Sequence, residues 1–260
     1  MRRVTRRLPA LALTALLAWV IAPAAAAEPP AVLLVGDSTM APQTGYGDAL
    51  CARLEPAVSC LNLARGGRST LSYRAEGLWQ RVIARLQAGE PGVVRHVLIQ
   101  FGHNDQPGKP GRSTDLATEF PVNLARYVAE VRAAGGVPVL VTPLTRRSFR
   151  DGKHHNDLLD WADSARAVAK AHQVPLIELN ALSAGAVQAM GPEAADRLAQ
   201  APPGAPAFDR THLGARGACV FADIVARALA VQVPALASQQ PGPDCDELAP
   251  PPRPRVAPPR

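Results

Sequence analysis

The sequence predicts an α/β domain in which a parallel sheet of five strands carries helices on both faces. Five short apolar runs, typical of strands buried on both sides, recur along the chain at residues 31–35, 58–63, 93–101, 137–141 and 174–179. Longer segments with apolar residues at helical spacing lie between these runs. This alternation is typical of parallel strands joined by crossover helices.

The connecting segments predict a helix after each strand. In chain order, helices are expected at residues 46–54, 71–86, 118–134, 158–171, 181–199 and 213–231. The fifth of these should be broken at Gly191-Pro192. Residues 106–113 and 201–206 should form loops, and the polar segment from Arg146 to Asn156 should be an exposed excursion beyond the fourth strand.

The length suits one globular α/β domain with a good core, or two small domains. The 260 residues are 47% hydrophobic and 19% charged, which excludes a disordered chain. The formal charge of +6 is concentrated at the start, since four arginines fall within the first seven residues. Without them 24 basic residues face 22 acidic ones. No stripe of basic residues interleaved with aromatics is present, so a nucleic-acid partner is not expected.

The N-terminal segment has the pattern of a secretory signal peptide. An Arg-rich start precedes the apolar residues 8–21, and the small residues Ala24 to Ala27 follow. Residues 1–27 are therefore expected to be removed, which gives a secreted or periplasmic protein without a stable membrane anchor. A retained anchor is the alternative, although the apolar stretch is short for a membrane span.

The domain itself is expected over residues 28–238, and a Pro/Arg-rich tail at 239–260 should be mostly disordered. We expect a monomer. Four cysteines remain after cleavage, and in an oxidising compartment an even number favours disulfides. Three pairings exist, and proximity in sequence favours Cys51–Cys60 with Cys219–Cys245.

A candidate nucleophile follows the first strand, where Gly36-Asp37-Ser38 ends the apolar run. Ligands of open α/β sheets bind at the carboxyl ends of the strands. A serine nucleophile needs a base and a group that orients the base. Asp209 and His212, in what reads as a short loop before the last helix, could supply both. Taken alone, each motif is more often a helix N-cap.

Three groups could receive the negative charge that develops on an ester oxygen. They are the backbone N–H of Ser38, the backbone N–H of Gly67 and the side-chain amide of Asn104. Taken singly, the Gly66-Gly67 and Asn104-Asp105 pairs are ordinary turn sequences. In combination with Ser38 and His212 they favour a serine esterase.

These motifs resemble the four sequence blocks of the SGNH (GDSL-type) hydrolases, in order. The blocks are Gly36-Asp37-Ser38, the turn at Gly67, Gly102-x-Asn104-Asp105 and Asp209-x-x-His212. The individual residues within the blocks, such as Phe101-Gly102-His103-Asn104-Asp105, are similar to those of the rhamnogalacturonan acetylesterase branch of this family. The resemblance covers residues 31–230.

The resemblance implies a three-layer flavodoxin-like fold, a Ser38–His212–Asp209 triad, and an oxyanion site formed by Ser38, Gly67 and Asn104. It implies no metal or other cofactor, and an acetylated plant cell-wall polysaccharide as substrate. Arg68 and His103 are candidate substrate-binding residues, although Arg68 could instead hold the glycine turn and His103 could support its loop. Two alternatives stay open: an esterase or thioesterase for longer acyl chains, and an inactive carbohydrate-binding relative.

Overall fold

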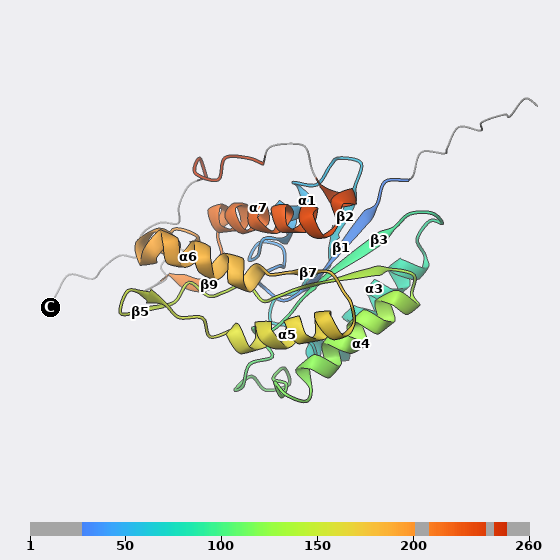
Figure 1. The fold of residues 1–260 in the computed structure, drawn as a ribbon, viewed down its shortest axis with the longest axis horizontal. Helices are drawn as coiled ribbons and strands as arrows, with labels where there is room; N and C mark the ends of the chain where they lie inside the picture. Colours follow the sequence, from blue (N-terminus) through green and yellow to red (C-terminus); the bar gives the residue numbers. More distant parts are fainter. Residues whose placement is uncertain (1–27, 201–207, 238–241, 249–260) are drawn as a thin grey trace, which may run out of the picture.

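The computed structural model describes residues 28–200, 208–237 and 242–248. Its centre is a parallel sheet with the strand order β2-β1-β3-β4-β7 (Figure 1). The strands are β1 Ala31–Gly36, β2 Ser59–Asn62, β3 Arg95–Gln100, β4 Val137–Val141 and β7 Leu176–Ile177. Counted within the sheet this order is 2-1-3-4-5, the flavodoxin-like arrangement. The predicted fold class is confirmed.

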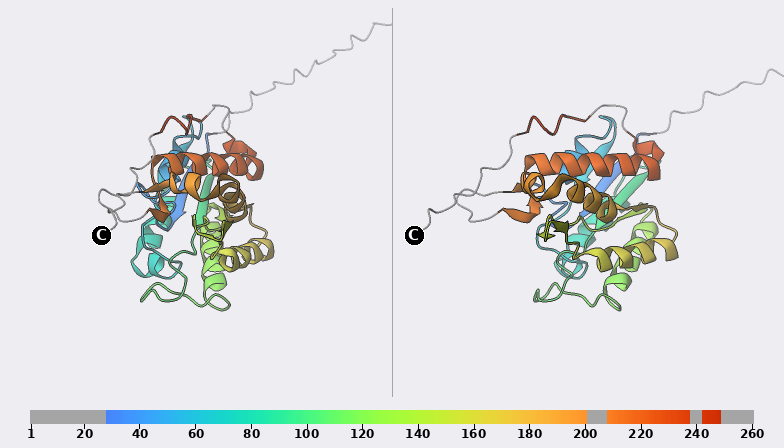
Figure 2. Two further views of the ribbon diagram at one scale, coloured as in Figure 1. Left: turned by 90° about the vertical axis from the view of Figure 1, so that its left-hand side faces the viewer. Right: turned by 60° about the vertical axis from the view of Figure 1, so that its left-hand side comes forward.

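Helices cover both faces of the sheet, as the views in Figures 1 and 2 show. One face carries α1 Gly47–Cys51, α6 Leu179–Asp196 and α7 Ala215–Gln232. The other carries α2 Ser72–Ala75, α3 Leu78–Gln87, α4 Phe120–Ala133 and α5 Leu159–Ala171. A short 3-10 helix, Pro234–Leu236, follows α7.

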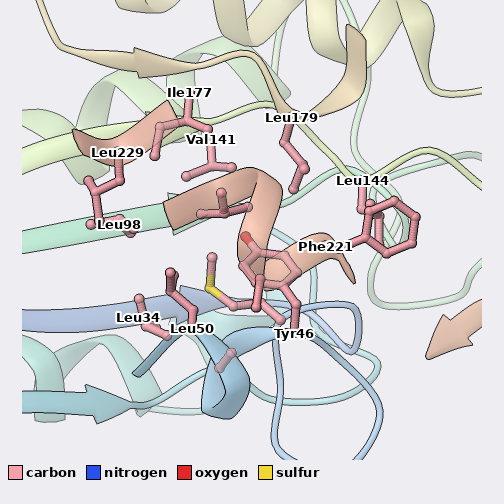
Figure 3. Packing of buried hydrophobic residues seen from close by; sticks show 14 of the residues in the cluster. Leu34, Tyr46, Leu50, Leu98, Val141, Leu144, Ile177, Leu179, Phe221 and Leu229 are labelled. Atoms are coloured by element: carbon pink, nitrogen blue, oxygen red, sulfur yellow. The ribbon is translucent and has the colours of Figure 1, made fainter. Parts of the chain in front are cut away.

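Alternation along the strands divides the core into two clusters. In β1, Leu34 packs toward α1 and α7, whereas Leu33 and Val35 pack toward the helices on the opposite face. Figure 3 shows the first cluster, where Leu34 lies beside Leu50 of α1 and Leu98 lies beside Leu229 of α7. Because both faces of β1, β3 and β4 are buried, apolar residues occupy most of their positions, which explains the apolar runs.

The helix predicted over residues 71–86 is wrong in one respect, since the structure divides it into α2 and α3. Gly77 lies between them with a φ of 74°, in the left-handed region. Glycine enters this region without the steric cost that a side chain imposes, and it ends helices for that reason. The apolar periodicity continues across the break, so the pattern alone did not reveal it.

The segment from Arg146 to Asn156 also differs from its prediction as an exposed excursion. It forms a small hairpin of β5 Phe149–Arg150 and β6 Lys153–His154, and Arg147 just before it is fully buried. A second antiparallel pair, β8 Ala199–Gln200 with β9 Asp209–Leu213, was not predicted. The first helix and the last sheet strand are shorter than predicted, because only Gly47–Cys51 and Leu176–Ile177 have regular geometry.

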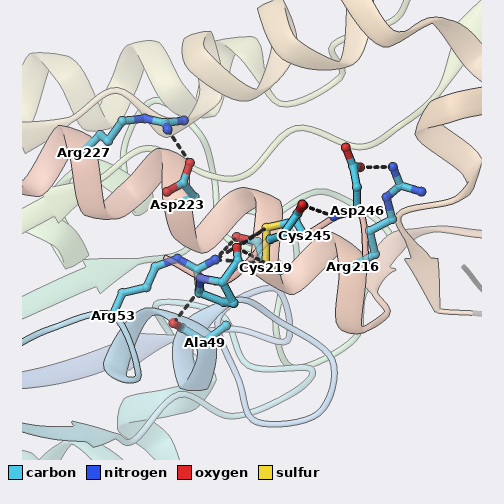
Figure 4. Close-up of a disulfide and its surroundings, with 10 residues drawn as sticks. Ala49, Arg53, Arg216, Cys219, Asp223, Arg227, Cys245 and Asp246 are labelled. Atoms are coloured by element: carbon cyan, nitrogen blue, oxygen red, sulfur yellow. Dashed lines mark hydrogen bonds and ion pairs between the residues drawn. A yellow bond between two sulfur atoms is a disulfide. The ribbon is translucent and has the colours of Figure 1, made fainter. Parts of the chain in front are cut away.

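The two disulfides favoured by sequence proximity are confirmed. Cys51–Cys60 joins the end of α1 to β2, with 5.4 Å between the Cα atoms. Cys219–Cys245 fastens residues 242–248 to α7, with 5.5 Å between the Cα atoms (Figure 4). Arg53 donates a 2.9 Å hydrogen bond to the carbonyl oxygen of Cys219 beside this second bridge.

Three predictions fall wholly or largely outside the described residues. They are the signal peptide at 1–27, the loop at 201–206 and most of the tail at 239–260. Within the part of the chain that the structure describes, no helix is long and apolar enough to cross a membrane.

Candidate active site

The turn after β1 places Ser38 at the carboxyl edge of the sheet. Asp37 shapes this turn from a fully buried position. Its Oδ1 accepts hydrogen bonds from the backbone N–H of Thr39 at 2.9 Å and from the Thr39 hydroxyl at 2.8 Å. Burial acts to raise the pKa of Asp37, but the His103 ring and the Thr39 bonds outweigh it and lower that pKa.

A histidine from the far end of the chain meets this serine. His212 Nε2 lies 2.8 Å from Ser38 Oγ, although the two residues are 174 positions apart. On the other side of the ring, His212 Nδ1 lies 2.6 Å from Asp209 Oδ2. A carboxylate facing Nδ1 keeps the proton there, which leaves Nε2 free to accept the serine proton.

Asp209 is held in place by its own strand. Its Oδ1 accepts hydrogen bonds from the backbone N–H groups of Thr211 at 2.8 Å and of His212 at 3.0 Å. Burial acts to raise the pKa of Asp209, but these bonds and the His212 ring outweigh it and lower the pKa. The carboxyl is therefore ionised at neutral pH and can stabilise an imidazolium.

The backbone that carries Asp209 and His212 is a strand and not the loop that the sequence predicted. Both residues lie on β9, which pairs with β8 and continues into α7. The N–H of Leu213 donates a 2.9 Å hydrogen bond to the carbonyl oxygen of Thr44, beyond the serine turn. The strand is thus fastened to the segment that carries Ser38.

The glycine turn that carries one of the expected oxyanion donors approaches the serine, and Asn104 is bound to that turn. An added Cβ on Gly66 would stand 3.7 Å from the Cβ of Ser38, which shows how closely this turn approaches the nucleophile. Gly67 follows with a φ of 78°, a conformation that favours glycine. Asn104 Nδ2 donates a 3.1 Å hydrogen bond to the Arg68 carbonyl oxygen, which fixes the amide against the same turn.

Asp105, which the sequence analysis did not select, connects the two loops that carry these donors. Its Oδ1 accepts hydrogen bonds from the Thr70 N–H at 3.0 Å, the Thr70 hydroxyl at 2.5 Å and the Thr114 hydroxyl at 3.1 Å. Burial raises the pKa of Asp105 to about 7, although these bonds oppose the rise. The only sequence signal was its place next to Asn104.

Arg68 and His103, the two candidate substrate-binding residues, both contact other residues of the site. Arg68 donates a 2.7 Å hydrogen bond to the Gly66 carbonyl oxygen and forms a 2.7 Å ion pair with Glu76, contacts that hold the glycine turn. His103 is only 2% exposed, and its Nδ1 lies 3.2 Å from Asp37 Oδ2. This contact with Asp37 fits the alternative role for His103, in which the ring supports the loop beside the serine turn; substrate contact by His103 stays a prediction.

Metal ligation has no evident place in this arrangement. Among residues 28–200, 208–237 and 242–248, no group of three or more His, Cys, Asp or Glu side chains is placed to hold a metal ion. The serine, the histidine, the aspartate and the hydrogen-bond donors are the groups of this site that can take part in acyl transfer.

Comparison with known proteins agrees with this geometry. The GDSL-like lipase/acylhydrolase family matches residues 34–220. The chain is 34% identical over 217 residues to the rhamnogalacturonan acetylesterase RhgT of Bacillus subtilis, with 78% of this chain and 90% of that protein covered. It is 29% identical over 219 residues to the rhamnogalacturonan acetylesterase of Emericella nidulans, with 76% of this chain and 84% of that protein covered.

Solved structures share the fold. The crystal structure of YxiM from Bacillus subtilis superposes with a TM-score of 0.66 at 26% identity, covering 78% of this chain and 57% of that one. The acetylxylan esterase Axe2 of Geobacillus stearothermophilus superposes with a TM-score of 0.56 at 17% identity, covering 80% of this chain and 96% of that one. The resemblance inferred from the sequence blocks is confirmed. The chain belongs to the GDSL-like lipase/acylhydrolase family.

Proposed function

We propose that this protein is a serine esterase that removes acetyl groups from a plant cell-wall polysaccharide of the rhamnogalacturonan type. The observation that carries the proposal is the pair of short contacts on His212, 2.8 Å to Ser38 Oγ and 2.6 Å to Asp209 Oδ2. The substrate class is supported by the names of the relatives, two of which are rhamnogalacturonan acetylesterases.

The proposed reaction has two halves. Ser38 Oγ attacks the acetyl carbonyl carbon while His212 Nε2 takes the hydroxyl proton, and Asp209 stabilises the imidazolium. The negative oxygen of the tetrahedral intermediate is received by the N–H groups of Ser38 and Gly67 and by the amide of Asn104. Its collapse breaks the bond between the acyl carbon and the sugar oxygen, and His212 gives its proton to that departing oxygen, which leaves as a sugar hydroxyl while the acetyl group stays on Ser38.

Deacylation repeats these steps with water. His212 takes a proton from the water as it attacks the acetyl carbonyl, and it then returns that proton to Ser38 Oγ as acetate leaves. The two halves need no oxidant or reductant because no atom changes its oxidation state, and every proton released by one group is accepted by another.

The test is the variant Ser38→Ala with Ser164→Ala as its matched control, since Ser164 lies on α5. Acetate release from acetylated rhamnogalacturonan oligosaccharides and hydrolysis of p-nitrophenyl acetate are both measured. We expect Ser38→Ala to lower kcat by about four orders of magnitude or more, because the nucleophile acts as part of a unit. Wild-type rates in Ser38→Ala would refute the nucleophile.

The same assays separate the proposed substrate from its alternatives. Acetyl esters should be hydrolysed much faster than octanoyl esters, because a small acyl pocket excludes the longer chain. Faster octanoyl hydrolysis would instead indicate an esterase for longer acyl chains. Binding of the oligosaccharide without acetate release, and without covalent labelling by a fluorophosphonate, would indicate an inactive carbohydrate-binding relative.

We further propose that the protein is exported after removal of residues 1–27 and acts as a monomer. The pattern of an Arg-rich start, an apolar stretch and the run Ala24–Ala27 supports the export. N-terminal sequencing of the mature protein should begin at Glu28, and size-exclusion chromatography with light scattering should give the mass of one chain.

A further inference from the structure

Arg147 binds the backbone on which the acid and the base of the triad are carried. Its Nη2 donates to the carbonyl oxygens of Asp209 at 2.8 Å and of His212 at 2.6 Å. Its own backbone N–H donates to the carbonyl oxygen of Arg210 at 2.9 Å. Three hydrogen bonds from a single residue therefore span the whole Asp209–His212 segment of β9.

Filling space does not explain an arginine at this position. Arg147 is fully buried, and transferring a guanidinium out of water is costly unless it is compensated. Burial lowers the pKa of Arg147 to about 10, while the charges of Asp209 and Asp196 act to raise it. Within the described residues, its Nε and Nη1 have no hydrogen-bond partner. An apolar side chain would avoid the cost of burying a guanidinium. The hydrogen bonds from Arg147 to β9 therefore need an explanation other than packing.

The neighbouring residue supports the same strand. Arg146 Nε donates a 3.2 Å hydrogen bond to the Thr211 hydroxyl, while Arg146 Nη1 pairs with Asp157 Oδ2 at 2.5 Å. Residues 146 and 147 thus contact every residue from Asp209 to His212 through the backbone or a side chain. The segment that leads from β4 into the hairpin acts as a clamp on the strand that carries the triad.

We infer that Arg147 is a positioning residue for the esterase reaction, an inference that rests on the proposed function. By binding the carbonyl groups of residues 209 and 212 together, it fixes the spacing that lets the Asp209 carboxylate face Nδ1 while Nε2 faces Ser38. Misplacement of a catalytic group by about 1 Å costs about 100-fold in rate, so loss of this clamp should lower kcat more than it changes KM.

The test uses Arg147→Met in the full chain. Its matched control is Arg150→Met, which makes the same change at an exposed position of β5. Arg147→Gln is the second variant, used where the methionine variant does not fold, and Arg147→Lys restores a buried cation that can donate to both carbonyls. For each variant kcat, KM and Tm are measured with p-nitrophenyl acetate. Amide hydrogen exchange is followed in peptides that cover 209–213, with peptides from β1 and β3 as internal references.

We expect Arg147→Met or Arg147→Gln to lose about 100-fold in kcat with KM changed by less than about threefold. Exchange should accelerate in 209–213 but not in β1 or β3. Arg147→Lys should recover about tenfold of the lost kcat, and Arg150→Met should stay within about twofold of the wild type.

The inference is overturned if the folded Arg147 variants keep kcat within about threefold of the wild type, or if exchange in 209–213 is unchanged. It is also overturned if the loss of activity only follows the fraction of unfolded protein, since that is a purely structural role. A wild type without esterase activity would refute the proposed function instead, and the exchange measurement would then still decide whether Arg147 fixes β9.

Discussion

Replacing Asp105 by asparagine should make the protein's stability depend less on pH. The carboxyl is buried between the two loops beside Ser38, and burial raises its pKa to about 7. Its Oδ1 accepts three hydrogen bonds, whereas its Oδ2 has no partner among the described residues. Asparagine keeps the accepting oxygen and carries no charge, so it imitates the protonated acid.

The sign and size of the effect follow from the two states of this carboxyl. In the unfolded chain it ionises near its ordinary pKa of 3.8, whereas in the folded protein it keeps its proton up to about pH 7. Between these values ionisation stabilises only the unfolded chain, so stability is lost as the pH rises and the loss is complete above the folded pKa. The whole displacement corresponds to about 4 kcal/mol, of which more than half falls between pH 5 and pH 8.

The assay is urea unfolding of wild type and Asp105→Asn at pH 5, 6, 7 and 8 with the disulfides intact. Contributions of the other titrating groups cancel in the difference between the two proteins. We expect the difference in unfolding free energy to move in favour of the variant by about 2 to 3 kcal/mol from pH 5 to pH 8. Asp151→Asn, at an exposed turn of the hairpin, is the matched control. A difference that stays constant, or that moves in favour of the wild type, refutes a buried protonated Asp105.

Three further predictions concern the scaffold and are measured by urea or thermal unfolding. Leu98→Ala, in the fully buried central strand β3, should cost about 3 kcal/mol because the cavity cannot collapse, and a loss below 1 kcal/mol would contradict the packing. Gly77→Ala should destabilise the folded protein by about 1 kcal/mol, because residue 77 has a positive φ. Gly185→Ala, at an open position within α6, should stabilise it by a similar amount. An effect of the same sign for both variants would contradict the backbone conformations of the two glycines. Replacing Cys219 and Cys245 together by serine should cost about 3 kcal/mol, since the bridge closes a loop with a sequence separation of 26, and an unchanged Tm would contradict it.

The strands of the sheet could be predicted from local sequence, and the triad from the resemblance of short sequence blocks to a known family. Strands buried on two faces appear as continuous apolar runs, and Ser38 stands where the first of these runs ends. The structure brings Ser38, His212 and Asp209 together as the sequence blocks implied. It also places the glycine turn beside Ser38 and binds Asn104 to that turn.

What could not be predicted depends on contacts between distant parts of the chain. Arg147 lies in a polar segment that is typical of exposed loops, and it is buried because carbonyl groups 62 and 65 positions later accept its hydrogen bonds. Asp105 is equally ordinary by local composition, and its unusual proton affinity follows from burial against Thr70, which lies 35 positions earlier. Gly77 ends a helix inside an unbroken apolar pattern, so periodicity could not reveal the division.

The outer strands of the sheet give little opportunity for other molecules to add to it. β7 has only two residues and β2 only four, and Cys60 on β2 is tied to α1. Unpaired N–H and C=O groups along a long, flat outer strand recruit further chains and start aggregation. Because both edge strands are so short, the folded protein should resist aggregation at concentrations where a sheet with longer edge strands would aggregate.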